Sequence, residues 1–303
     1  MSGHPGRRHP GAWPFALETG SPVVDVEVAG GTFVPPLEQE VRSPRNSVPT
    51  QSSRQLPRSA AAAPGRPTAT RPRPGRLVGA TAIALTASVA IQNAVLTWAG
   101  APGYGDPITE VLAFHAEHRD AVAIAVGLEA LNLPLLLGFV TGLHGIVRRC
   151  GETGRDWSRL AVAAGATLAA VLAFYVVLWD GVVLSAGELT GPSPELELAW
   201  QMHAAAFALA LPALGTTLIG AAMAAHASGL TPAWQRLLGL TGGGVLIVAG
   251  AANLAIADGS SLLFVGMPGY LAWLVWLLVT GVRLVRAGTI ERSDVDALSE
   301  AEV

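Results

Sequence analysis

The chain has 303 residues, of which 51% are hydrophobic and 14% charged, and its formal net charge is −3. A soluble domain carries about 25% charged residues, so this composition, with a mean hydropathy of +0.45, excludes an ordinary soluble protein and predicts a lipid bilayer as partner. A single cysteine, Cys150, excludes an internal disulfide. We expect no nucleic-acid partner.

Residues 1–75 differ in composition from the rest of the chain. They hold runs rich in Pro, Ser, Thr and Arg, such as SPRNSVPTQSSRQLPRS, without helical periodicity. Such a segment has too few apolar groups to offset the entropy lost on ordering. It therefore predicts a disordered cytoplasmic tail.

Residues 76–287 predict an all-α, polytopic integral membrane domain with six transmembrane helices. Each apolar run is long enough, at about 1.5 Å per residue, to cross a hydrocarbon layer of about 30 Å. The expected spans are 77–99, 119–147, 157–186, 197–227, 234–257 and 260–286. Residues 288–303 follow as a short acidic cytoplasmic tail.

The arginines predict the topology, because cytoplasmic loops collect positive charge. They precede the first span, fill the second connection, lie in the fourth and follow the last: Arg71, Arg73, Arg76, Arg148, Arg149, Arg155, Arg159, Arg236, Arg283, Arg286 and Arg292. Both termini are therefore expected inside. Four tryptophans at span ends, Trp98, Trp157, Trp200 and Trp234, are expected at the membrane–water interfaces.

Polar residues inside the expected spans are the candidate site, because lipid makes such groups costly. They fall in the outer half of the bundle: Glu129, Asp180, His203, Gln92, Asn93, Asn132 and Asn253. Glu129 and Asn132 are three residues apart and share a helix face. Our first hypothesis is an outward-facing cavity that binds a small amphiphile, a lipid or a proton. The alternative is a set of interhelical hydrogen bonds that only fix packing.

The histidines suggest a further alternative. His115, His118 and His144 lie on the second span or just before it, and His203 and His226 lie on the fourth. Paired histidines on two helices could hold b-type haem, although no CxxCH motif is present. The segment HAEHRD could hold an outer metal, but it lacks the HExxH arrangement. We expect no cofactor.

Enzymatic motifs are missing: there is no GxSxG elbow, no P-loop and no GxGxxG after a strand. A desolvated carboxylate such as Glu129 or Asp180 could still act as a general acid, but we expect binding rather than catalysis. The spacing of Gly239 and Gly243 would let another helix approach closely, and we interpret it as helix packing. A different function class is a non-catalytic subunit or scaffold that would present this Gly-rich helix to a partner or to a second copy of the chain.

Several segments resemble one family. The run HAAAFALALPALGTTLIGAAMAAHASGLTPAWQRLLGLTGGGVLIVAG resembles the fourth and fifth helices of the bacterial membrane proteins grouped as domain of unknown function 4386. RDAVAIAVGLEALNLPLLLGFVTGLHGIVRR and MPGYLAWLVWLLVTGVRLVR are similar to its second and last helices. The resemblance covers about residues 77–287, and His203 and the Gly229–Trp234 turn match the pattern. It implies six helices in a bacterial cytoplasmic (inner) membrane and no established activity.

Overall fold

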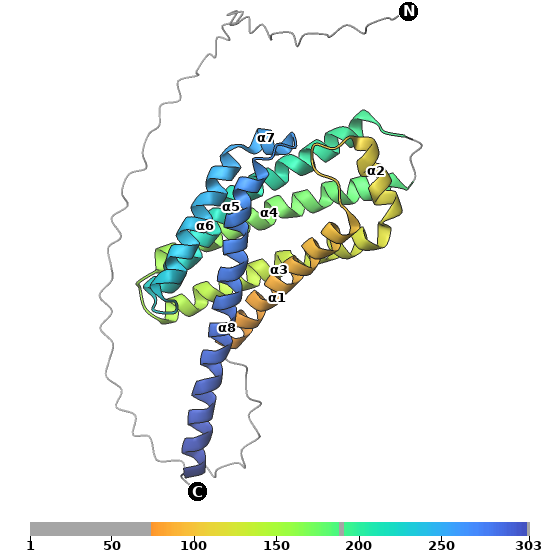
Figure 1. Cartoon of the computed structure of the whole chain (residues 1–303). Coiled ribbons are helices and arrows are strands. Elements are labelled where there is room, and N and C mark those ends of the chain that lie inside the picture. The colour runs from red at the N-terminus through yellow and green to blue at the C-terminus, as the bar shows by residue number, and fades with distance from the viewer. Residues whose placement is uncertain (1–73, 188–190, 302–303) are drawn as a thin grey trace, which may run out of the picture. The chain divides into compact units, whose positions relative to one another are not determined.

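The computed structural model describes residues 74–187 and 191–301, with side chains described as far as residue 287. All regular elements among these residues are α-helices (Figure 1). Their bounds are α1 Pro74–Ala99, α2 Ile108–Glu117, α3 Arg119–Arg149, α4 Arg155–Ala186, α5 Pro194–Ala227, α6 Ala233–Ala251, α7 Asn253–Ala257 and α8 Leu263–Ala301. The tail expected over residues 1–75 lies outside the described residues, apart from Pro74 and Gly75.

Five of these helices are long and apolar enough to cross a membrane: α1, α3, α4, α5 and α8 as far as Ala287. The chain is therefore a multi-pass membrane protein. The fifth expected span, 234–257, is not one continuous helix. It is divided at Ala252 into the 19-residue α6 and the single-turn α7. The apolar sequence continues through Ala252, so hydropathy carried no sign of this interruption.

Two further elements differ from expectation. The last helix does not end near residue 286 but continues to Ala301, through a stretch that contains no proline. The other is α2, which was not predicted. Its apolar residues Val111 and Phe114 recur at helical spacing and are buried, so the periodicity was present, but ten residues are too few for a span.

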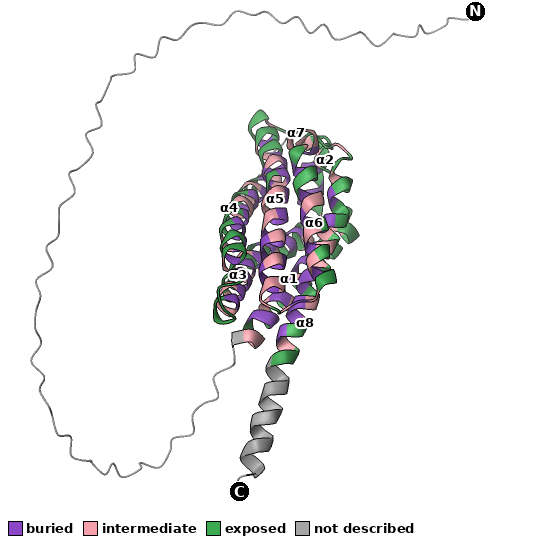
Figure 2. Ribbon diagram, turned by 90° about the vertical axis from the view of Figure 1, so that its left-hand side faces the viewer, coloured by how far each residue is buried: buried purple, intermediate pink, exposed green. Residues whose placement is uncertain are grey.

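Six helices form a closed ring of neighbours. α1 packs against α3 and α8, and the circuit continues through α3–α4, α4–α5, α5–α6 and α6–α8. Buried residues face the inside of this ring and exposed ones face outward (Figure 2). Large apolar side chains such as Val177, Val248 and Phe264 are exposed on that outer surface. Such a surface suits a lipid solvent.

Glycines in the ring allow close backbone contact between α5, α6 and α8. A Cβ on Gly243 of α6 would lie 2.6 Å from the Gly215 carbonyl oxygen of α5, and one on Gly269 of α8 would lie 2.6 Å from the Gly242 carbonyl oxygen. Gly239 similarly faces Ala222 of α5. The glycines therefore pack inside the chain's own bundle, as interpreted from their spacing, and they do not support the alternative of a scaffold.

The tryptophans divide into two groups. Trp98, Trp157 and Trp234 have 95%, 40% and 53% of their surface exposed, as expected for side chains at a membrane interface. Trp200 differs from the expectation, because it is buried with 7% exposed. It lies near the start of α5, where α2 and the loop before it cover the helix.

Candidate functional site

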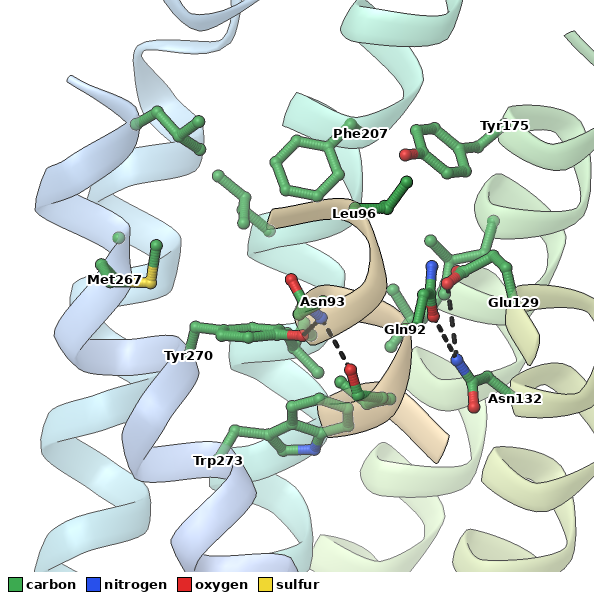
Figure 3. Close-up of a pocket in the computed structure, with 18 of the residues that line it drawn as sticks. Gln92, Asn93, Leu96, Glu129, Asn132, Tyr175, Phe207, Met267, Tyr270 and Trp273 are labelled. Atoms are coloured by element: carbon green, nitrogen blue, oxygen red, sulfur yellow. Dashed lines mark hydrogen bonds between the residues drawn. The ribbon is translucent and has the colours of Figure 1, made fainter. Parts of the chain in front are cut away.

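A cavity of about 370 Å³ lies inside the ring, in the half nearer to α2. Its walls come from α1, α3, α4, α5 and α8 and from the loop after α1 (Figure 3). Most of the lining is apolar, with residues such as Leu85, Leu172 and Leu214. The polar lining side chains are Gln92, Asn93, Tyr104, Glu129, Asn132, Tyr175 and Tyr270.

An amide–carboxyl network forms one wall of the cavity. Asn132 Nδ2 donates to Gln92 Oε1 at 2.9 Å and, at 3.4 Å, to Glu129 Oε2. All three side chains are buried, and the Asn132 Oδ1 atom has no hydrogen-bond partner among the described residues. A buried acceptor left unpaired costs about 1–3 kcal/mol. This wall therefore contains a buried acceptor without a partner close to a carboxyl group.

The opposite wall holds a second polar pair. Asn93 Nδ2 of α1 donates to Val89 O at 2.8 Å and to the Tyr270 hydroxyl of α8 at 3.0 Å (Figure 3). Met267 and Trp273 lie on the same face of α8. This contact joins α1 to α8 beside the cavity.

All three tyrosines of the chain line the cavity. The hydroxyls of Tyr104 and Tyr175 are 3.5 Å apart, and the Tyr104 ring lies 5.4 Å from the Phe207 ring. Burial raises the pKa of Tyr104 well above its usual range, so its phenol stays protonated and neutral. The tyrosines thus give the apolar walls hydrogen-bonding groups that carry no charge.

His203 lies directly behind Tyr175, outside the cavity lining. Its ring stacks on Tyr175 with centroids 3.9 Å apart and on Trp200 at 4.8 Å. Its Nδ1 atom donates to the Tyr175 carbonyl oxygen at 3.1 Å. Since a backbone carbonyl can only accept, Nδ1 carries the hydrogen. His203 therefore positions Tyr175 rather than facing the cavity.

His115 of α2 is held in one tautomer. Its Nε2 accepts from Trp179 Nε1 at 2.9 Å, and its Nδ1 lies 2.6 Å from the Val111 carbonyl oxygen. Because an indole N–H can only donate, the hydrogen must sit on Nδ1 and the ring is neutral. Burial lowers the pKa of His115 accordingly.

We expect acid to destabilise the protein through His115. The unfolded ring takes up a proton near pH 6.5 whereas the folded ring resists it, so its contribution to stability is present above that pH and lost below it. The melting temperature in detergent should fall between about pH 7.5 and about pH 5, and the fall should be smaller in His115→Asn. An equal fall in both proteins would contradict this role.

The other histidine hypotheses receive no support. His144 hydrogen-bonds to Ser158 at 2.7 Å, and His226 lies 3.0 Å from the Thr231 carbonyl oxygen. His115 and His203 are likewise engaged, between aromatic rings that leave no haem-sized gap between them. Among the described residues, no group of three or more His, Cys, Asp and Glu side chains could hold a metal ion.

The structure brings together only part of the expected polar cluster. Gln92, Asn93, Glu129 and Asn132 line the cavity, whereas Asp180, Asn253 and His203 do not. Asp180 is half-buried on α4, and Asn253 is half-buried at the start of α7. The tyrosines and Trp273 were missed by sequence reasoning. The signal that could have found them is that Tyr175 and Tyr270 lie inside apolar spans, where a phenol hydroxyl needs a partner.

A family model described as a domain of unknown function (DUF4386) matches residues 76–281. No curated protein and no solved structure matches the chain. The matched residues include every side chain that lines the cavity.

Proposed function

The chain belongs to the family defined by this domain of unknown function, DUF4386, and we propose that it binds a small amphiphile within the helix ring. Since no activity is established for the domain, the proposal is drawn from the chain's own residues. The observation that carries the proposal is a cavity whose walls are apolar but which contains one concentrated polar wall, Gln92, Glu129 and Asn132. Small-molecule sites have this character and volumes of about 300–1,000 Å³.

The polar wall supports a ligand role over a packing role. If Gln92, Glu129 and Asn132 only joined α1 to α3, their hydrogen bonds would satisfy one another. Instead Asn132, which lines the cavity, has its Oδ1 atom buried without a partner among the described residues. A polar head group would supply the missing donor, and an apolar tail would cover the leucines of α4 and α5.

Mass spectrometry of the purified protein tests this proposal. Protein extracted gently from its host membrane should release a small amphiphile on denaturation, in amounts comparable to the chain. The matched variants are Glu129→Gln, in the cavity wall, and Asp180→Asn, which removes a carboxylate outside the lining. Glu129→Gln should retain less ligand and Asp180→Asn the same amount as the parent. Equal retention by all three, or no ligand in any, would overturn the proposal.

We also propose that the chain crosses a bacterial cytoplasmic membrane six times, with both termini in the cytoplasm. The 19 residues of α6 would extend roughly 28 Å, close to the hydrocarbon thickness of about 30 Å. Four arginines lie in or beside the α3–α4 connection: Arg148, Arg149, Arg155 and Arg159. The positive-inside tendency therefore favours a cytoplasmic position for that connection, and the cavity then lies in the outer half.

The single cysteine gives a direct test of this topology. Cys150 is exposed in the α3–α4 connection, so a membrane-impermeant maleimide should label it only after the cells are permeabilised. The control is Glu117→Cys in a Cys150→Ser background. Glu117 is exposed at the end of α2, so its replacement should react in intact cells. Labelling of Cys150 in intact cells would reverse the orientation.

A further inference from the structure

We infer that the ligand of this cavity is an amine, in which an apolar chain ends in an ammonium group that binds beside Glu129 and Asn132. This inference rests on the proposed binding of an amphiphile and names its chemical class. Three features of the lining lead to it: its charge, the vacant acceptor and its aromatic rings.

The charge of the lining has one sign. Glu129 is its acidic residue, and no Arg, Lys or His is found among the described residues that line the cavity. Glu129 is buried, with 8% of its surface exposed. A fatty acid or a phosphate in this space would meet a carboxyl group and no compensating base, which is costly in apolar surroundings. An ammonium group would instead pair with the carboxylate.

The hydrogen-bonding pattern also selects a donor. The Asn132 amide hydrogens are directed to Gln92 and Glu129, so the polar atom that it leaves unpaired among the described residues is the acceptor Oδ1. An ammonium group has three donors and no acceptor. A bound ammonium group would pair with the Glu129 carboxylate through a charge-assisted hydrogen bond and would have further donors for an acceptor such as Asn132 Oδ1.

Aromatic rings form part of the remaining lining of the cavity. Tyr104, Tyr175, Phe207, Tyr270 and Trp273 line the same cavity. The faces of such rings attract cations within about 6 Å of the centroid, and they add apolar surface for the chain of the ligand. The neutral state of His115 and of the Tyr104 phenol means that neither group opposes a cation.

The test titrates n-octylamine, n-octanol and sodium octanoate into the full chain in phosphatidylcholine nanodiscs, followed by calorimetry. The amine should bind most tightly. Glu129→Gln should weaken amine binding about tenfold or more, the loss of one charge-assisted hydrogen bond. Asp180→Asn, the control carboxylate outside the lining, should leave it unchanged.

The outcomes distinguish a failure of this inference from a failure of the proposed function. If octanol binds as tightly as octylamine, or octanoate binds more tightly, the inference that the ligand is an amine is overturned, while the site for an amphiphile remains. Unchanged amine binding by Glu129→Gln would also overturn it. Failure of all three probes would overturn both. The affinities of the parent protein for the three probes test the amine inference even if a variant does not fold.

A lipid headgroup could supply the same ammonium. The titration is therefore repeated in nanodiscs that contain phosphatidylethanolamine. Because the described lining has no base to compensate a phosphate, this lipid should leave the octylamine affinity unchanged. A weaker apparent octylamine affinity in these nanodiscs would mean that the lipid competes for the site, and it would replace the free amine by an aminolipid as the ligand.

Discussion

Replacing Gly243 by alanine should destabilise the bundle by about 1–3 kcal/mol, the usual cost of overpacking. The added Cβ would lie 2.6 Å from the Gly215 carbonyl oxygen and 2.5 Å from Ile219 Cγ1, both on α5. Real Cβ contacts are longer, so α5 and α6 would have to separate. The better helix propensity of alanine offsets at most about 1 kcal/mol of this cost.

The neighbouring residue provides a matched control for that measurement. Gly244 lies on the same turn of α6, and a Cβ there would meet no atom within 4 Å. Gly244→Ala should therefore keep or raise the melting temperature in detergent, while Gly243→Ala lowers it. Equal shifts in the two variants would mean that the close α5–α6 approach does not stabilise the fold.

Filling the cavity should abolish ligand binding without unfolding the protein. Ala210 of α5 is buried and lines the cavity, so the ring introduced by Ala210→Phe would occupy the space of the ligand. We expect the affinity to fall about a hundredfold or more, equivalent to about 2.7 kcal/mol. The melting temperature should stay unchanged or rise, because the ring replaces empty space with contacts.

The control for this variant introduces the same ring one residue away. Leu209 has 51% of its surface exposed on the outside of α5, so Leu209→Phe should leave binding unchanged. Octylamine titrated into both variants and the parent gives the comparison. Normal binding by Ala210→Phe would place the ligand elsewhere, and parallel losses in both variants would indicate a general effect on α5.

The chemistry of the candidate site could be predicted only in part. Glu129 and Asn132 share a face because a helix repeats every 3.6 residues, and that local geometry holds in the structure. Gln92 and Asn93 are adjacent in sequence, so they point to different sides of α1, and both sides meet the cavity. The sequence places Asp180 with them only because all lie at a similar depth in the expected membrane spans. Depth does not give the rotation of a helix, and the carboxylate lies outside the lining.

Burial of the aromatic residues could not be read from the sequence either. Trp200 resembles the interfacial tryptophans in its place near a helix end, yet Tyr104 and His115 cover it. Both covering residues are supplied by the segment after α1. Their position depends on how that loop and α2 fold back over α5, which is a contact between distant parts of the chain.

By itself, the sequence determined the membrane class, most of the helix limits and which polar groups would be costly in lipid, because hydropathy and helical period are local properties. Only the tertiary structure decided which of those groups meet around a cavity and which helices the glycines of α6 contact. The physical reason is that lipid is as apolar as a leucine-rich interior. The hydropathy of an apolar span therefore does not distinguish the side that faces lipid from the side that faces other helices. Close packing of side chains and backbone, as between Gly243 and Gly215, decides which helices are neighbours and how each is rotated.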